Sequence, residues 1–125
     1  MATKVATWSS LPDRKPVAVE VAGRPLVVVR HGQAVSVLSG LCPHRGGRMA
    51  DATVEGDRIV CGAHGWDFNL GDGLSPSSPS TTGDSLRCFA AVVDEQADAV
   101  LVDEEEVRTW ARDNVMPFDP DDLLP

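Results

Sequence analysis

Short β-rich stretches separated by turn-forming residues dominate the first two-thirds of this 125-residue chain. The stretch 16–21 alternates apolar and polar side chains, and the stretches 26–30 and 34–38 follow it around turns that contain Gly23 and Gly32. We expect Gly32 to adopt a positive φ, as hairpin turns require. Short strands this closely spaced are typical of antiparallel sandwiches and barrels, because parallel strands need long crossover connections. The pattern predicts an all-β, antiparallel sandwich or barrel.

The rest of the chain supplies more strands and one helix. Further strands are expected at 57–60, 66–69, 86–93 and 99–102. Helical signals are confined to 103–113, where Asp103 can cap the first turn and Glu106 stands three residues later. Val107 and Trp110 give this segment a thin apolar face. We therefore expect a short C-terminal helix after the β region.

Acidic residues are concentrated at the C-terminal end. The whole chain has a formal net charge of -8, and residues 94–125 hold eleven carboxylates against only Arg108 and Arg112. The end of the last expected strand at 102 and the acidic charge beyond it together predict a β domain over 1–102 and an acidic helix and extension over 103–125. An acidic end without a basic stripe disfavours binding to nucleic acid, because phosphate backbones are also anionic.

Neither a membrane segment nor an export signal is evident in the sequence. No apolar stretch approaches the roughly 20 residues that span a bilayer, and the start MATKVATWSS lacks a hydrophobic segment followed by a cleavage site. Three cysteines are an odd number and suit a disulfide scaffold poorly. We expect a cytoplasmic protein that does not associate with membranes.

Two short boxes combine the thiols and imidazoles that bind metals. The first reads CPHRGG and contains Cys42 and His44, and the second reads CGAHGW and contains Cys61 and His64. Sixteen residues separate His44 from Cys61. Proline and glycines in both boxes favour turns, from which side chains so close in sequence can point at one centre. Two thiolates with two imidazoles suit either zinc or an iron–sulfur cluster.

This pattern, with Arg-Gly after the first His and Gly-Trp after the second, resembles the Rieske iron–sulfur family over roughly residues 4–102. The family holds a [2Fe–2S] cluster between two loops, with two Cys on one iron and two His on the other. The resemblance implies that Cys42 and Cys61 bind one iron and that His44 and His64 bind the other. It also implies a Rieske-type β fold with a cluster-binding loop subdomain.

Two positions indicate the branch of the family. Rieske proteins of respiratory cytochrome complexes carry an additional Cys in each box, and Gly47 and Ala63 stand at the matching positions here. The chain also contains no Tyr, which removes a hydroxyl donor used by the high-potential members. We expect a midpoint potential at the low end of the Rieske range, roughly -150 mV. The Val-Ala-Thr-Trp opening and the late Pro-Phe-Asp-Pro stretch are similar to the amino-terminal Rieske part of glutamate-synthase-like flavoproteins.

The function expected from this resemblance is one-electron transfer between a reductase and an acceptor, such as an oxygenase or a flavoenzyme. Rieske oxygenases add a mononuclear iron bound by two His and a carboxylate, and only His31 is left for such a site. We therefore expect an electron carrier, free-standing or part of a larger protein, and not an enzyme. A structural zinc module and an iron–sulfur redox sensor are the alternatives.

Residues outside the boxes are expected to have structural roles. His31 is predicted to be an exposed turn residue, and Cys88 to be an inert cysteine packed in a strand. Trp110, Met116 and Phe118 are predicted to pack on the β domain or on a partner, because apolar side chains in so acidic a segment favour association.

Overall fold

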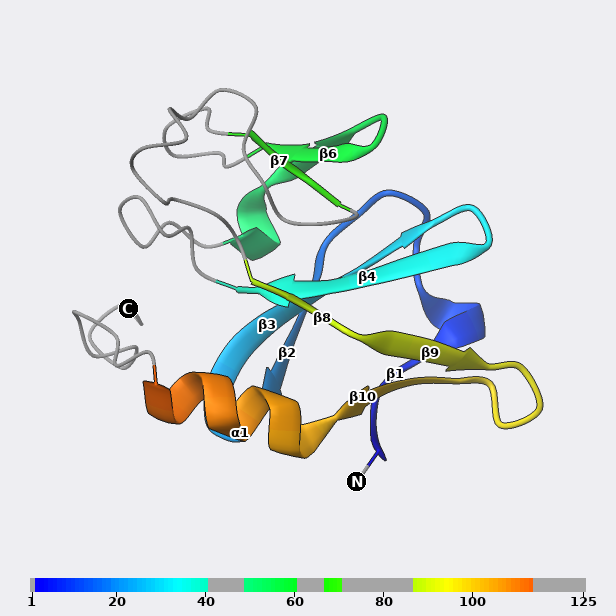
Figure 1. Ribbon diagram of the computed structural model, residues 1–125. Helices are drawn as coiled ribbons and strands as arrows, with labels where there is room; N and C mark the ends of the chain where they lie inside the picture. The colour runs from blue at the N-terminus through cyan, green and yellow to red at the C-terminus, as the bar shows by residue number, and fades with distance from the viewer. Residues whose placement is uncertain (1, 41–48, 61–66, 71–86, 114–125) are drawn as a thin grey trace.

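The computed structural model describes residues 2–40, 49–60, 67–70 and 87–113 (Figure 1). In that part of the chain the strands and the helix are β1 (Ala2–Thr7), β2 (Val17–Val21), β3 (Arg24–His31), β4 (Ala34–Ser39), β5 (Thr53–Glu55), β6 (Arg58–Val60), β7 (Asp67–Asn69), β8 (Cys88–Phe89), β9 (Ala91–Asp94), β10 (Ala99–Asp103) and α1 (Glu104–Asp113). Short 3-10 turns lie at Trp8–Ser10 and Met49–Asp51. The sequence-based prediction did not include the strands β1 and β5.

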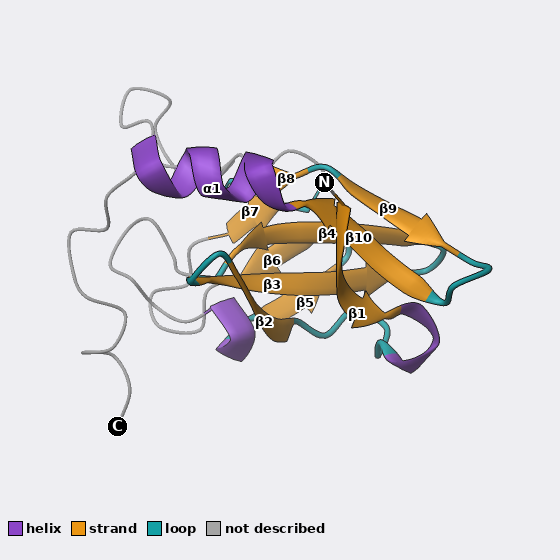
Figure 2. Ribbon diagram, turned by 90° about the horizontal axis from the view of Figure 1, so that it is seen from below, coloured by secondary structure: helices purple, strands orange, loops and turns teal. Residues whose placement is uncertain are grey.

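The strands form three antiparallel sheets, with the orders β1-β10-β9, β2-β3-β4-β8 and β5-β6-β7. Only Ala90 separates β8 from β9, so that one continuous segment belongs to the first two sheets and curves them into an open barrel (Figure 2). We call β5-β6-β7 the small sheet. The predicted all-β, antiparallel architecture with a short C-terminal helix is confirmed.

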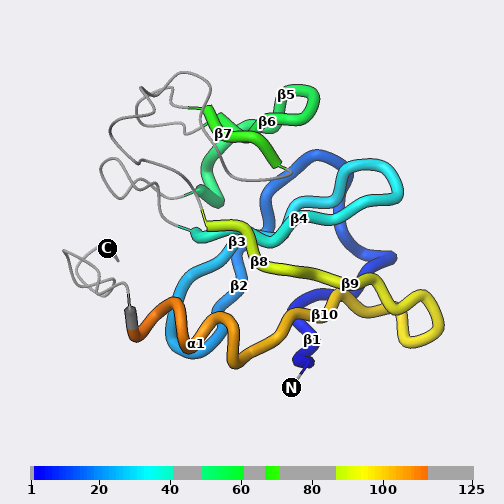
Figure 3. Tube along the Cα trace, in the orientation of Figure 1, coloured from blue at the N-terminus to red at the C-terminus, as the bar shows by residue number. Residues whose placement is uncertain are grey.

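Two hydrophobic cores lie on opposite faces of β3 and β4. Along β3, Val28 belongs to one core, whereas its neighbours Val27 and Val29 belong to the other, and all three are fully buried. Successive side chains of a strand point to opposite faces, so these two strands form a layer that both cores share. Figure 3 shows the small sheet on one side of this layer and α1 on the other.

We call the core on the α1 side the barrel core. Its buried residues are Trp8, Leu11, Val21, Leu26, Val28, Val37, Phe89, Val100, Val102 and Val107. The core on the other side is the small-sheet core, and its buried residues are Val27, Val29, Leu38, Met49, Ala52, Ile59, Phe68 and Leu70.

The helix α1 is packed on the barrel. The carboxylate of Asp103 caps it by accepting a hydrogen bond from the Glu105 N–H at 3.0 Å. Val107 is fully buried in the barrel core, and the Trp110 ring meets Phe89 edge to face at a centroid distance of 5.3 Å. The prediction that Trp110 packs on the β domain is confirmed, whereas Met116 and Phe118 lie outside the described residues.

Polar contacts also attach α1 to the strands. Glu106 accepts hydrogen bonds from Arg87 at 3.3 Å and from the Ala90 N–H at 3.4 Å. Ala90 is the residue at which the predicted 86–93 strand divides into β8 and β9. Arg24 also contacts the helix: its guanidinium lies 5.8 Å from the centroid of the Trp110 ring and donates to the Ala111 carbonyl at 2.9 Å. These contacts hold α1 against the barrel.

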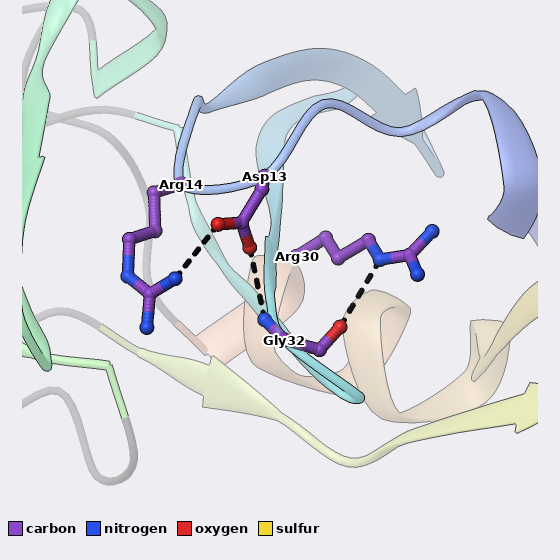
Figure 4. Close-up of polar contacts among 4 residues, drawn as sticks. All are labelled: Asp13, Arg14, Arg30 and Gly32. Carbon is purple, nitrogen blue, oxygen red and sulfur yellow. Dashed lines mark hydrogen bonds and ion pairs between the residues drawn. The ribbon is translucent and has the colours of Figure 1, made fainter.

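The turn between β3 and β4 is fastened by a polar network (Figure 4). Gly32 has a φ of 68°, as predicted. Its N–H donates to Asp13 at 2.9 Å, its carbonyl accepts from Arg30 at 3.1 Å, and Arg14 donates to Asp13 at 2.7 Å. The Gly32 N–H, followed by Arg14, keeps the pKa of the Asp13 carboxyl below its usual value, although partial desolvation opposes the shift.

Candidate metal centre

The four candidate ligands, Cys42, His44, Cys61 and His64, lie outside the described residues. The described residues on either side of the two boxes nevertheless show how the fold holds the ends of each box. Their arrangement decides whether the two boxes can serve one centre.

A backbone hydrogen bond closes the base of the first box. The N–H of Met49 donates to the carbonyl of Gly40 at 2.9 Å, and the N–H of Gly40 donates to the carbonyl of Pro25 at 2.8 Å. A Cβ at position 40 would lie 2.7 Å from the carbonyl carbon of Pro25. Glycine is therefore required at the point where the chain leaves β4 and enters the first box, a requirement that sequence reasoning missed.

A ladder pair closes the base of the second box. Val60, at the end of β6, pairs with Asp67, at the start of β7. Beyond β7 the N–H of Leu70 donates to the carbonyl of Asp57 at 2.8 Å. Strands of three residues each are short for independent stability, so the small sheet depends on packing against the shared layer of β3 and β4.

Both bases rest on one core. Met49, the first described residue after the first box, packs with Ile59 of β6 and Phe68 of β7, and all three are fully buried. The two boxes therefore start and end around the same small-sheet core. This is the arrangement that the paired-box pattern requires if both boxes serve a single centre.

His31 differs from its prediction as an exposed turn residue. It is the last residue of β3 and is half-buried, with its Nε2 2.9 Å from the hydroxyl of Ser36. The Ser36 hydroxyl donates to the carbonyl of Leu70 at 2.8 Å, so it accepts from His31. Ser36 is buried on β4, and the chain His31–Ser36–Leu70 joins the barrel hairpin to the end of β7. Local sequence predicted the turn but not this cross-sheet contact.

Cys88 lies on β8, as predicted, and is half-buried against the small-sheet core. Its Sγ lies 3.8 Å from the carbonyl of Leu70. The prediction that Cys88 packs within a strand is confirmed.

The donor set fits an iron–sulfur centre better than a closed zinc site. Each box contributes one thiolate and one imidazole, whereas structural zinc sites usually pair like residues at fixed spacings in each half. A [2Fe–2S] cluster with two Cys on one iron and two His on the other uses such a mixed set. The shared core beneath both boxes is consistent with one cluster held between them.

The comparison with family models decides the assignment. The model described as Rieske [2Fe-2S] domain matches residues 1–108. The chain belongs to the Rieske [2Fe-2S] domain family. Its cofactor is accordingly a [2Fe–2S] cluster, as the resemblance of the boxes implied. Among the helices of the described residues, none is long and apolar enough to cross a membrane.

Curated relatives match about half of this chain, and the matched stretch spans less than two thirds of the length of each relative. The oxygenase component of 3-ketosteroid-9-alpha-monooxygenase from Mycobacterium tuberculosis is 44% identical over 63 residues, which cover 49% of this chain and 16% of that protein. Ferredoxin CarAc from Metapseudomonas resinovorans is 36% identical over 61 residues, covering 49% of this chain and 57% of the ferredoxin.

Solved structures match over a larger share of the chain. The ferredoxin of carbazole 1,9a-dioxygenase from Nocardioides aromaticivorans IC177 superposes with a TM-score of 0.73 at 28% identity, covering 82% of this chain and 96% of that one. A chain in the complex of reduced oxygenase and oxidized ferredoxin in carbazole 1,9a-dioxygenase superposes with a TM-score of 0.72 at 31% identity, covering 82% of this chain and 93% of that one. The fold of this Rieske domain is therefore that of a Rieske ferredoxin.

Proposed function

We propose that this chain transfers single electrons through a Rieske [2Fe–2S] cluster, from a reductase to an acceptor such as an oxygenase or a flavoenzyme. The observation that carries the proposal is the match to a Rieske ferredoxin over nearly that protein's whole length, at 28% identity. Family membership supports the cofactor, and the ferredoxin found in a complex with its oxygenase supports the type of partner.

In this proposal Cys42 and Cys61 bind one iron, and His44 and His64 bind the other. The cluster supplies a one-electron couple when it is bound. The two thiolates offset the charge of the ferric irons and sulfides, and the neutral imidazoles add none, so that the oxidised centre is about neutral. An all-cysteine shell would be more negative and harder to reduce. Histidine ligation therefore raises the potential above that of a four-cysteine cluster.

The chain acts as a carrier rather than as an enzyme in this proposal. The Rieske domain occupies residues 1–102 and the acidic segment residues 103–125, and the protein works in the cytoplasm. Because only His31 remains outside the boxes, and it is engaged with Ser36, the acceptor's chemistry must occur at a separate site. That site belongs either to a partner protein or to another domain of a longer polypeptide.

Metal analysis with spectroscopy tests the cofactor and its ligands. We expect a brown protein with equal amounts of iron and acid-labile sulfide, and a reduced form with the EPR signal of a histidine-ligated cluster. Cys42→Ser and Cys61→Ser should lose the cluster, His44→Cys should keep a cluster of lower potential, and Cys88→Ser should leave it unchanged. A colourless protein that contains zinc would contradict the proposal and favour the structural zinc module.

Rapid-mixing kinetics test whether the cluster passes electrons from a reductase to an acceptor. A flavin-dependent reductase should reduce the cluster, and an oxygenase-type Rieske acceptor should reoxidise it within the time of one turnover. Reduction without transfer to any acceptor would favour the redox sensor instead. The expected midpoint potential is roughly -150 mV.

A further inference from the structure

An ion pair lies at the base of the second box. The guanidinium of Arg58 on β6 donates to the carboxylate of Asp67 on β7 at 2.9 Å. The two residues are diagonal neighbours on one face of the ladder, because Arg58 pairs with Asn69 and Asp67 with Val60.

The two partners differ in their exposure to solvent. The Arg58 side chain is 53% exposed, whereas that of Asp67 is only 12% exposed. The negative charge is therefore held in a place that water screens poorly, and the positive charge lies at the surface. A low-dielectric position lets the carboxylate act over a longer distance than the guanidinium.

Covalent geometry places this pair close to the proposed cluster. Three peptide units join Asp67 to His64, which limits the distance between their Cα atoms to about 11 Å. Cys61 directly follows Val60, the ladder partner of Asp67, which limits the distance from Cys61 to Asp67 to about 9 Å. Both ligands of the second box are thus within the range of an incompletely screened charge.

We propose that the Arg58–Asp67 pair tunes the reduction potential of the cluster, an inference that rests on the function proposed above. Reduction adds one negative charge to the cluster. The Asp67 carboxylate opposes that addition and lowers the potential, and the Arg58 guanidinium offsets part of this effect. Both residues act on the cluster through their charge and do not bind it.

The opposite charges predict shifts of opposite sign. Arg58→Gln should make reduction less favourable by about three- to tenfold in the equilibrium constant. Asp67→Asn should shift the constant in the other direction by a larger factor, because the carboxylate is less exposed to solvent than the guanidinium. A tenfold change corresponds to 59 mV for a one-electron couple. The midpoint of the double variant Arg58→Gln/Asp67→Asn should lie between those of the two single variants and above that of the wild type, because Arg58 offsets only part of the effect of Asp67.

A redox titration followed by EPR on the full, cluster-containing chain measures these midpoints. Arg58→Lys should have a midpoint potential close to that of the wild type, since it keeps the positive charge and loses only the planar arrangement of the guanidinium donors. The effect of Arg58→Gln should shrink in 1 M salt, because Arg58 is exposed. Arg108→Gln is a matched control: its side chain is 55% exposed and ion-paired with Glu104, but α1 lies across the barrel from the small sheet (Figure 1).

The outcomes separate the two proposals. Wild-type protein with a titratable cluster, together with an unchanged midpoint in Arg58→Gln, would overturn the tuning role alone. Equal shifts in Arg58→Gln and Arg108→Gln would overturn it as well, because they would reflect net charge only. Wild-type protein that binds no cluster would overturn the proposed function and the tuning role together. If Asp67→Asn fails to fold, the two Arg58 variants and the control still decide the question.

Discussion

The barrel and the small sheet are stabilised in different ways. The barrel has strands of up to eight residues, and the helix α1 covers one side of its core. Each strand of the small sheet has three residues, and its core includes side chains from β3 and β4. The barrel therefore has most of its stabilising contacts within itself, whereas the small sheet depends on the barrel for part of its core.

This difference matches the roles of the two regions. A centre that exchanges electrons has to lie near the surface, where a compact core of its own is hard to build. The small sheet solves this by sharing the buried layer of β3 and β4, whose residues Val27 and Val29 are fully buried. Metal binding then adds stability that a short three-stranded sheet lacks.

The largest expected effect comes from the small-sheet core. Phe68→Ala removes a fully buried ring and should cost about 3–5 kcal/mol of unfolding free energy. Because Phe68 lies two residues beyond the second box, cluster content should fall as well. Denaturant unfolding, together with iron and sulfide analysis of the purified variant, measures both effects.

Leu26→Ala is the control for Phe68→Ala in the barrel core, where Leu26 is also buried. It should cost about 2–5 kcal/mol, yet the protein that remains folded should keep its full cluster content. Equal loss of iron in both variants would contradict the distinction between the two cores.

Gly40→Ala tests the close backbone contact at the base of the first box. The added Cβ would lie 2.7 Å from the Pro25 carbonyl carbon and should cost about 1–3 kcal/mol as an overpacked position. Gly23→Ala is the contrast, since its Cβ would meet nothing within 4 Å and its φ of +77° causes the only strain. We expect cluster content to fall in Gly40→Ala and to be unchanged in Gly23→Ala.

Trp110→Ala tests the attachment of α1 to the barrel. The variant loses the edge-to-face contact with Phe89 and the stacking of Arg24, which should cost about 1–2 kcal/mol for a half-buried ring. Thermal unfolding should shift downward while the visible spectrum of the cluster stays the same. A bleached spectrum would show that the barrel's helix also supports the small sheet.

The smallest expected effect is a pH dependence at the far end of the barrel. The pKa of Asp98 is lowered from 3.8, chiefly by the hydroxyl of Ser9 and also by the Ser9 N–H, although partial desolvation opposes the shift. A depressed folded-state pKa stabilises the protein above the unfolded value, and this stabilisation disappears as the pH falls through the lower folded value.

Ser9→Ala removes the hydroxyl donor to Asp98. The variant should therefore be slightly less stable than the wild type at pH 7, and the two proteins should converge below about pH 4. Unfolding midpoints measured between pH 2 and pH 7 test this. A stability difference that stays constant across that range would show that the hydrogen bond does not act through the ionised Asp98.

Much of the β architecture could be predicted because it rests on local signals. Alternation and turn residues located β2, β3 and β4, and Gly32 takes the positive φ that its turn requires. The strand β5, by contrast, has only three residues, and Val54 is its single apolar one. This pattern is too short to predict a strand, and β5 is held in the sheet by its pairing with β6. At Ala90, where the predicted 86–93 strand divides, the N–H donates to Glu106 of α1, a contact between residues too far apart in sequence for a local pattern to contain.

The sequence alone was sufficient to recognise the family and to propose a donor set, because the Cys-x-His and Cys-x-x-His boxes are local patterns whose chemistry follows from residue type and spacing. The residues that support the ends of those boxes could be identified only from the tertiary structure. The contacts concerned join different strands or loops: Gly40 with Pro25, Ser36 with His31 and Leu70, and Arg58 with Asp67. Such contacts depend on strand register and on how two sheets pack, and both are set by burial across the whole fold rather than by neighbouring residues.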